Sequence, residues 1–367
     1  MLATLRNDIR MLLRGISGQA PPYLVHRGTA RRYRAAVRPT PMRVVALERR
    51  ELDLTVWLDN AHERPFEPGQ FLTLCAVVEG RRLRRAYSIS SPPDAPGRLR
   101  LTVRRVPDGA MSNHLNDTVE VGDTIEVLGP SGRFIWKPET GRALLAIAGG
   151  SGLTPLMAMF YAALEHGAVP IHLIYANRSP TSGLYRDELD ALSDEHPQFS
   201  VTHVIGDLTP ADLDACPFEP SETDAYLCGP SGLMAAARKH LMEAGVAAER
   251  IASERFHSPA GPESREPRIN TPQSVSIQGP TRAWTCRTTP GETILEAGLR
   301  GGAALPFSCA MGGCGACRVR LQSGSVVMDE PHCLTAEERQ DGVILTCVAR
   351  ALEPCVIAVN SDSEDIG

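Results

Sequence analysis

The sequence predicts a multi-domain protein with an antiparallel β-barrel, a doubly wound α/β domain and a small α+β domain. Three observations lead to this fold class. Residues 41–138 contain short apolar and β-branched runs divided by turn residues, residues 139–257 alternate strand-like and helix-like segments, and residues 274–367 contain a tight cysteine loop with a distant further cysteine. The chain has 367 residues, 43% of them hydrophobic, which is enough for two or three separate cores.

The barrel prediction rests on six short runs that are rich in strand-forming residues. Pro, Gly, Asp and Asn separate these runs, and six such strands are typical of a small closed barrel. The predicted strands are Met42–Leu47, Leu52–Leu58, Phe71–Val78, Ala86–Ser90, Leu99–Val106 and Thr124–Leu128.

Two segments of this region offer groups that bind ligands. Arg85-Ala86-Tyr87-Ser88 provides a ring and a hydroxyl that can cover a flavin and contact its N5 edge, while the arginine reaches a phosphate. Gly109-Ala110-Met111-Ser112-Asn113 offers free N–H groups at a predicted helix start, where a phosphate binds well. Each segment alone is a weak indication, because similar residues occur in ordinary strands and turns.

The α/β prediction depends on a strand, a glycine turn and a helix in succession. Ala143–Ala148 is a buried-strand run that leads into Gly149–Pro155, and a helix follows from Leu156 to about His166. This is the context of a loop that binds dinucleotide phosphates. Cys228-Gly229-Pro230 ends another strand, at the edge where such sheets bind ligands. The other predicted strands and helices are Ile171–Ala176, Phe199–Ile205, Ala225–Cys228, Ile251–Glu254, Tyr185–Leu192 and Gly232–Ala244.

The cysteines near the end of the chain predict an iron–sulfur cluster. Cys309, Cys314 and Cys317 follow the C-x₄-C-x₂-C spacing, and Cys347 comes thirty residues later, as in plant-type [2Fe–2S] proteins. Two sulfide-bridged irons need four thiolates, and one tight loop can supply only three of them. Glycines in the loop let its N–H groups turn toward the sulfides. A structural zinc site fits this spacing poorly.

The remainder of this region predicts a hairpin, a helix and three strands after a linker. Residues 258–273 are rich in Pro, Ser and Gly, as linkers are. The predicted elements are the hairpin of Val275–Ile277 with Trp284–Arg287, the helix Thr293–Leu299, and the strands Val319–Leu321, Val343–Leu345 and Val356–Val359.

Composition limits the compartment and the partners. Ten cysteines in a chain of this length are not a disulfide framework, and Cys75, Cys228, Cys286 and Cys355 lie in apolar runs as small core residues. Free thiols beside a cluster loop predict a reducing cytoplasm. A net charge of −5 gives no indication of nucleic-acid binding, and no apolar run approaches the ~18 residues of a membrane span.

Residues 1–40 form a basic N-terminal arm. They hold eight arginines against the single Asp8, and their apolar residues recur at helical spacing. Such an amphipathic helix either binds a membrane surface or an acidic partner, or packs one apolar stripe on the rest of the protein.

The order and spacing of three segments resemble the ferredoxin–NADP⁺ reductase superfamily. These are Arg85–Ser88, Gly149–Pro155 and Cys228–Pro230, and the cysteine-containing region resembles a plant-type ferredoxin of β-grasp fold. The fusion is similar to the reductase components of bacterial oxygenases, and the resemblance covers residues 41–360. It implies a flavin-binding barrel, an NAD(P)-binding α/β domain and a [2Fe–2S] ferredoxin domain.

The resemblance also implies roles for individual residues. Ser88, Cys228 and Glu254 are the candidate catalytic residues: Ser88 beside flavin N5, Cys228 near the nicotinamide ring and Glu254 as a proton relay. A buried strand-end thiol and a strand-end surface charge are the plain structural alternatives for Cys228 and Glu254. The candidate cofactor-binding residues are Arg85, Ala86, Tyr87, Ser88, Gly109, Met111 and Ser112 for the flavin, Gly150, Gly152, Thr154, Cys228 and Gly229 for the nicotinamide nucleotide, and Phe256 beside the flavin ring.

The sequence gives weaker evidence on which nicotinamide nucleotide and which flavin the protein binds. The strand before Asn177 has no acid at its end, whereas Arg178 and Arg186 follow it and can meet a 2′-phosphate. This favours NADPH slightly over NADH. FAD is favoured over FMN because the resemblance is to FAD-containing members.

The implied activity is electron transfer from NAD(P)H through the flavin and the cluster to a protein acceptor. A nicotinamide gives two electrons together as hydride, the cluster accepts one, and a flavin can do both. An oxygenase, a hydroxylase or a desaturase is the expected partner, and the protein is expected to be a monomer. A redox-sensing module and a stand-alone reductase of a small acceptor are the alternatives.

Overall fold

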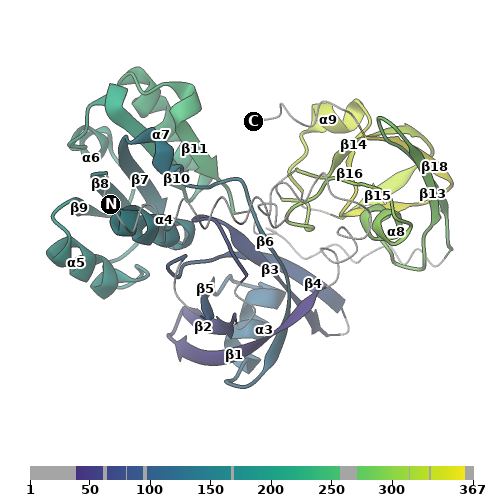
Figure 1. The fold of residues 1–367 in the computed structure, drawn as a ribbon, viewed down its shortest axis with the longest axis horizontal. Coiled ribbons are helices and arrows are strands. Elements are labelled where there is room, and N and C mark those ends of the chain that lie inside the picture. Colours follow the sequence, from purple (N-terminus) through teal and green to yellow (C-terminus); the bar gives the residue numbers. More distant parts are fainter. Residues whose placement is uncertain are drawn as a thin grey trace, which may run out of the picture. The chain divides into compact units, whose positions relative to one another are not determined.

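The computed structural model describes residues 39–60, 64–79, 81–93, 97–166, 169–256, 271–313, 315–329 and 332–359. These residues belong to two compact units, one within Thr40–Pro262 and the other within Glu263–Gly367 (Figure 1). The predicted basic arm falls almost wholly outside the described residues, and so does most of the predicted linker. Within the described residues, no helix has the length and hydropathy needed to span a membrane.

The first part of the larger unit is a six-stranded antiparallel barrel. Its strand order is β4-β3-β6-β1-β2-β5, and a bridge between Ile89 and Leu101 brings the two edge strands together. Fully buried side chains such as Leu72, Val44 and Leu101 fill its interior. The strands are β1 (Thr40–Arg49), β2 (Asp53–Asp59), β3 (Phe71–Val78), β4 (Arg81–Ser88), β5 (Arg98–Arg104) and β6 (Thr124–Ser131).

Strand β4 is the barrel element that the sequence predicted least well. It begins at Arg81 rather than Ala86 and ends at Ser88 rather than Ser90. Its first five residues include four arginines, so they carry little apolar pattern. Continuous pairing with β3, from Val78↔Arg81 to Phe71↔Ser88, makes them a strand regardless of their propensity.

Helix α3 (Ala110–Thr118) packs against the barrel, and Ala158 of the α/β domain also reaches the barrel core. Met111 and Leu115 are buried in the barrel core. The buried Asn116 amide donates to the carbonyls of Val103 at 3.0 Å and Ser112 at 2.9 Å. The last turn of the helix is thereby fixed relative to β5.

The second part of the larger unit is a five-stranded parallel sheet with helices on both faces, as predicted (Figure 1). Its strand order is β11-β10-β7-β8-β9, so the order reverses between β7 and β10, and this reversal is the topological switch point. The strands are β7 (Ala143–Gly149), β8 (Ile171–Asn177), β9 (Phe199–Ile205), β10 (Thr223–Cys228) and β11 (Ile251–Glu254), and the helices are α4 (Leu153–His166), α5 (Arg186–Glu195), α6 (Pro210–Asp214) and α7 (Ser231–Glu243).

Alternate residues of β7 supply two separate cores. Leu144 and Ala146 pack with α4 and α5, whereas Leu145 and Ile147 pack with α6 and α7. A strand buried on both faces appears in the sequence as a continuous apolar run, which is why this strand was predictable. The short helix α6 was not predicted, and a capping box from Thr209 defines it.

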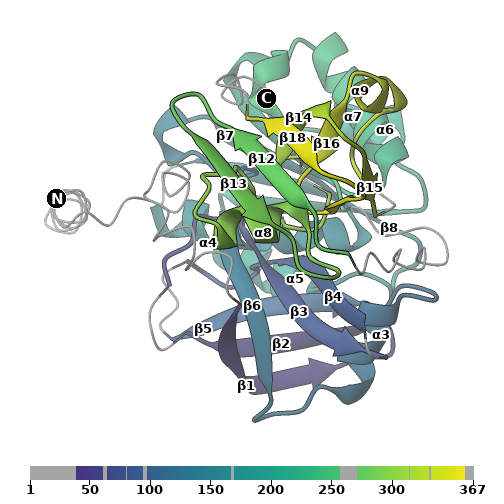
Figure 2. The same cartoon turned by 90° about the vertical axis from the view of Figure 1, so that its right-hand side faces the viewer.

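The smaller unit is a mixed five-stranded sheet of order β13-β12-β18-β14-β16 with a packed helix (Figure 2). The β12–β13 hairpin is antiparallel, as predicted, and β12 and β18 are parallel. Helix α8 approaches β12 so closely that a Cβ atom on Gly298 would lie 2.9 Å from the Ile277 side chain. The elements are β12 (Ser274–Gln278), β13 (Ala283–Arg287), α8 (Ile294–Arg300), β14 (Arg318–Ser323), β15 (Val326–Met328), α9 (Ala336–Gln340), β16 (Val343–Leu345), β17 (Ala349–Ala351) and β18 (Cys355–Ala358).

We predict that Thr293→Ala lowers the stability of the smaller unit by about 1 kcal/mol. Thr293 and Glu296 form a capping box at the start of α8, and the substitution leaves the Glu296 N–H without its side-chain acceptor. The measurement is the loss of cluster absorbance in a urea titration. Thr209→Ala removes the same motif from the larger unit and is the control. An unchanged cluster midpoint in Thr293→Ala would contradict the prediction.

Candidate active site

The predicted flavin segment lies on the last four residues of β4. Ser88 is buried and pairs with Phe71, while Arg85, Ala86 and Tyr87 are half-buried. Because side chains alternate along a strand, Arg85 and Tyr87 share one face of β4. Burial raises the pKa of the Tyr87 hydroxyl, so it stays protonated at neutral pH.

The start of α3 presents backbone donors rather than side-chain ones. Gly109 is the N-cap, and the N–H groups of the first helical turn have no acceptor within the helix. The Ser112 hydroxyl is turned back to the chain, where it accepts from Val106 N at 3.2 Å and donates to Gly109 O at 3.3 Å. The Met111 side chain is buried in the barrel core. An anion at this helix would therefore meet N–H groups.

The glycine turn after β7 contacts the end of β10 backbone to backbone. A Cβ atom on Gly152 would lie 2.0 Å from the carbonyl oxygen of Cys228, and one on Gly229 would lie 2.8 Å from Gly149 N. One on Gly149 would lie 2.5 Å from the Pro230 ring. These glycines are therefore required by space, and the contact lies at the switch point, where such sheets bind ligands.

Two residues that the sequence analysis did not select brace this turn. Tyr175, at the end of β8, donates to Gly150 O at 3.0 Å and accepts from Leu184 N at 2.9 Å, and burial raises its pKa to about 12. Arg104, at the end of β5, donates to Ser182 O, and its guanidinium lies beside the turn, 3.4 Å from where a Cβ on Gly150 would be. Arg104 thus brings a positive charge from the barrel to the glycine turn.

The remaining turn residue, Thr154, is buried. Its hydroxyl donates to Ser151 O at 3.0 Å and holds the turn closed at the start of α4. Gly150 has a φ of +54°, in the left-handed region that glycine adopts without strain.

Cys228 and Glu254 are neighbours across the sheet. They are paired residues of the parallel strands β10 and β11. The Cys228 thiol is fully buried, and burial together with the Glu254 charge raises its pKa well above the usual value. It therefore remains a neutral thiol at physiological pH. Phe256 follows two residues after Glu254 and is 43% exposed, so its ring is available for stacking.

Arg178 and Arg186, the predicted 2′-phosphate ligands, are both exposed. They border the loop between β8 and α5, and Arg186 donates to Pro180 O within that loop at 3.5 Å. Their exposure leaves both guanidinium groups accessible to a ligand phosphate.

Three of the four predicted cluster ligands are buried together in the smaller unit, and Cys314 lies outside the described residues. The sulfur atoms of Cys317 and Cys347 are 3.1 Å apart, and Gly312 N–H donates to Cys347 Sγ at 3.2 Å. Nearby Cys317 and Cys309, together with burial, raise the pKa of Cys347 well above its usual value. Thiolates this crowded need a cationic centre, and an N–H group aimed at one sulfur is typical of an iron–sulfur site.

Comparisons with known proteins agree with this arrangement. Models of three domain families match the chain: an oxidoreductase FAD-binding domain over residues 52–136, an oxidoreductase NAD-binding domain over 146–239 and a 2Fe-2S iron-sulfur cluster binding domain over 278–352. The chain belongs to the ferredoxin–NADP⁺ reductase superfamily, with a C-terminal [2Fe–2S] ferredoxin domain. The predicted family, the fold class and the binding of FAD, a nicotinamide nucleotide and a [2Fe–2S] cluster by this reductase are thereby confirmed.

The reductase also resembles characterised proteins over most of its length. It is 32% identical to one of the subunits of 1,2-phenylacetyl-CoA epoxidase from Escherichia coli, over 80% of this chain and 88% of the relative. It is 36% identical to the ferredoxin reductase component of 3-ketosteroid-9-alpha-monooxygenase from Mycolicibacterium smegmatis, over 79% and 86% of the two chains. The structure of phthalate dioxygenase reductase superposes with a TM-score of 0.62 at 25% identity, covering 88% of this chain and 98% of that one.

We predict that Gly152→Ala reduces kcat/KM for the nicotinamide nucleotide at least about 10-fold, because the added methyl group forces β10 away from the glycine turn. The measurement is anaerobic reduction of the flavin followed by its absorbance. Gly232→Ala is the control, since its added Cβ would lie in open space. Wild-type kcat/KM in Gly152→Ala would show that the switch-point contact is dispensable.

Proposed function

We propose that this reductase takes electron pairs from NAD(P)H and delivers them singly, through its ferredoxin domain, to an oxygenase, hydroxylase or desaturase. The observation that carries the proposal is the sequence of three sites in one chain: a spatially restricted glycine turn for the nucleotide, a flavin barrel beside it, and a cysteine loop for the cluster. Bound flavin supplies the exchange between two-electron and one-electron chemistry, which neither of the other groups can perform.

The residues of the chain would hold and orient these groups. Ser88 would lie at the reacting edge of the flavin, with Arg85 on its phosphates and Tyr87 against its ring. Backbone N–H groups from Gly109 to Ser112 would bind the flavin phosphates. The neutral thiol of Cys228 would offer the nicotinamide a small, uncharged wall. Glu254 is the one predicted proton-relay group, and its pairing with Cys228 puts it at the same sheet edge.

The glycine turn and the β10 strand end would hold the nicotinamide nucleotide. Gly150, Gly152 and Thr154 belong to the turn, and Cys228 and Gly229 face it across the switch point. Arg104 is added here as a contact to the nucleotide phosphates, because its guanidinium reaches the turn from the barrel. Phe256, which is exposed at the end of β11, would cover the flavin ring.

The names of the relatives support the choice of acceptor. Both sequence relatives described above are components of monooxygenase or epoxidase systems, so a protein acceptor is the common feature. A redox sensor would have no need of a hydride-transfer site, and the restricted switch point argues against it. A stand-alone reductase of a small acceptor would turn over that acceptor without a protein partner.

Two expectations on the state of the protein belong to the proposal. The reductase would act as a monomer, and its basic arm would contact a membrane surface or an acidic partner. Residues 1–38 of that arm lie outside the described residues.

We predict that Arg178→Ala lowers kcat/KM for NADPH about 10-fold and leaves that for NADH within about twofold. The exposed guanidinium at the end of β8 would pair with the 2′-phosphate, which NADH lacks. Steady-state reduction of ferricyanide with each nucleotide measures both constants. Arg250→Ala, on the far part of the same domain, is the control. Equal losses with both nucleotides would refute the assignment to the 2′-phosphate.

We predict that Cys347→Ser leaves flavin reduction by NAD(P)H intact but abolishes reduction of cytochrome c or of the native acceptor. Serine cannot replace the thiolate that completes the set of four, so the route beyond the flavin is broken. Stopped-flow absorbance follows the flavin, and acceptor turnover follows the cluster. Cys355→Ser removes a buried thiol elsewhere in the same domain and is the control. Full acceptor turnover by Cys347→Ser would overturn the proposed route.

A further inference from the structure

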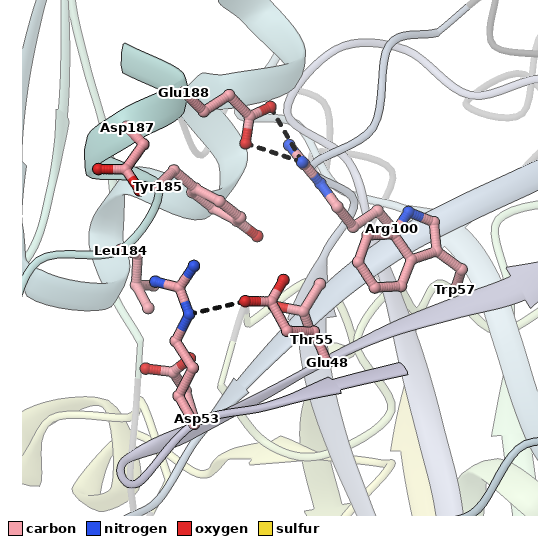
Figure 3. A pocket seen from close by; sticks show the side chains of 10 residues that line it. Glu48, Asp53, Thr55, Trp57, Arg100, Leu184, Tyr185, Asp187 and Glu188 are labelled. Carbon is pink, nitrogen blue, oxygen red and sulfur yellow. Dashed lines mark hydrogen bonds and ion pairs between the residues drawn. The ribbon is translucent and has the colours of Figure 1, made fainter. Parts of the chain in front are cut away.

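A largely buried ion pair joins the barrel to the nucleotide-binding domain within the larger unit (Figure 3). Arg100, on β5, donates through Nη1 to both carboxylate oxygens of Glu188, on α5, at 2.9 Å. Only 11% of the Arg100 side chain and 29% of the Glu188 side chain are exposed. Tyr161, from α4, also donates to Glu188. A charge-assisted contact with this little solvent has a defined geometry and resists sliding.

Tyr185 stands beside this pair and joins the same two domains. Its ring lies 4.5 Å from the Arg100 guanidinium carbon, as in a cation–π contact. Its hydroxyl is hydrogen-bonded to two barrel hydroxyls, Ser90 Oγ at 2.9 Å and Thr102 Oγ1. Thr102 is in turn bonded to Thr55 at 2.8 Å. The four hydroxyls form a buried chain from the nucleotide-binding domain into the barrel wall.

The backbone of Tyr185 is unusual for its residue type. Its φ is +54°, in the left-handed region, which costs about 1 kcal/mol or more for a residue with a Cβ atom. A side chain held in such a conformation needs surrounding contacts that compensate for it, and here those contacts are the ring stacking and the two hydroxyl bonds.

Ser90 connects both the Arg100–Glu188 pair and Tyr185 to the flavin segment. Arg100 Nη2 donates to Ser90 O at 2.7 Å, Arg100 Nε to Ser90 Oγ at 3.2 Å, and Ser90 N to Arg100 O at 2.8 Å. Ser90 lies two residues after Ser88, and Ile89 between them is held by Gln70 O at 2.9 Å. The Ser88 end of the flavin segment is therefore connected to α5 through Ser90 and Arg100.

The other side of Tyr185 leads to the nucleotide site. Tyr185 is the last residue of the loop that begins at Arg178, after β8. Leu184, next to it, is bound by the Tyr175 hydroxyl that also holds the glycine turn. Tyr185 is thus linked by hydrogen bonds to the predicted flavin segment and, through its neighbour Leu184, to the glycine turn.

We propose that Tyr185 and the Arg100–Glu188 pair are positioning residues that set the approach of the nicotinamide to the flavin edge at Ser88. The step they serve is transfer of a hydride from NAD(P)H to flavin N5, which oxidises the nucleotide to NAD(P)⁺ and reduces the flavin by two electrons. All three act through other residues rather than on the reacting atoms. The inference rests on the proposed function and adds to it the residues that fix the two domains.

The structural alternative is a joint that only stabilises the fold. Such a joint would change the unfolding midpoint, but it would leave the limiting rate of hydride transfer in the folded protein unchanged. A positioning joint changes that rate, because a small misplacement of reacting groups costs up to about 100-fold in rate. The two roles are therefore separable by kinetics at saturating nucleotide.

The test is Tyr185→Phe in the full-length holoenzyme, which keeps the ring and removes only the hydroxyl. We expect the limiting rate of anaerobic flavin reduction to fall about 10-fold, with the nucleotide Kd within about twofold and the flavin content unchanged. The charge-transfer absorbance between nicotinamide and flavin should weaken in parallel. An unchanged limiting rate and charge-transfer band would overturn the proposal.

Double variants test whether the effect passes through Ser90. If it does, Tyr185→Phe combined with Ser90→Ala is no slower than the slower single variant. The other outcome is that the rate losses of Tyr185→Phe and Ser90→Ala multiply, whereas those of Tyr185→Phe and Thr102→Val do not. The Tyr185 hydroxyl would then act through Thr102 on the barrel wall, and the proposed route through Ser90 would be wrong. Glu188→Gln supplies a second variant that lowers the rate by weakening the ion pair, should Tyr185→Phe fold poorly.

Two controls separate this inference from the proposed function. Glu292→Gln breaks an ion pair of similar length to Arg300 in the other unit and should leave flavin reduction unchanged. If the wild-type protein itself fails to reduce its flavin with NADH or NADPH, the proposed function fails. If the wild type is active and Tyr185→Phe equals it, only the positioning role fails.

Discussion

At the carboxyl edge of the nucleotide-binding sheet, two strand ends approach until their backbones touch. Gly152 lies against the Cys228 carbonyl and Gly229 against Gly149, with no room for a side chain between them. This contact brings the ends of β7 and β10 together at the switch point of the sheet. The glycine turn, the buried thiol and the bracing hydroxyl of Tyr175 all depend on it. Any substitution that separates the strands would disturb them together.

The two halves of the larger unit share polar contacts as well as apolar ones. Arg104 and Arg100 both leave β5 and end on the loop and helix that follow β8. Strand β5 thus contributes to the barrel wall and to the contacts with the nucleotide-binding domain in the same few residues. The ferredoxin domain belongs to the other compact unit and carries its own capped helix and core. Hydride chemistry and single-electron chemistry are therefore assigned to separate compact parts of the chain.

The local sequence was sufficient to predict a strand where its hydrophobic pattern was strong. The runs of β3, β9 and β11 were predicted to the residue, and in β3 and β9 this is because apolar and β-branched residues dominate the run. The start of β4 was missed because its arginines give no apolar pattern, and only pairing with β3 makes these residues a strand. Strands β15 and β17 were missed because their mutual pairing, which joins Val326 to Ala351 and Met328 to Ala349, defines them rather than their local sequence. Cysteine spacing indicated the cluster, but the N–H bond from Gly312 to Cys347 required the fold. Arg104, Tyr175 and Tyr185 were not selected, since their partners lie far away in the sequence.

The neutral state of Cys228 has a consequence for the durability of the protein. A reduced flavin that meets dioxygen releases hydrogen peroxide, and cysteine is attacked by peroxide chiefly as its thiolate. The Cys228 thiol is enclosed at the strand end, and its pKa is raised by burial and by the charge of Glu254. Under the proposed function, this sulfur atom would lie close to the redox chemistry and yet react slowly with peroxide. If Cys228 borders the nicotinamide as proposed, its burial would also spare that part of the site from oxidative damage over many turnovers.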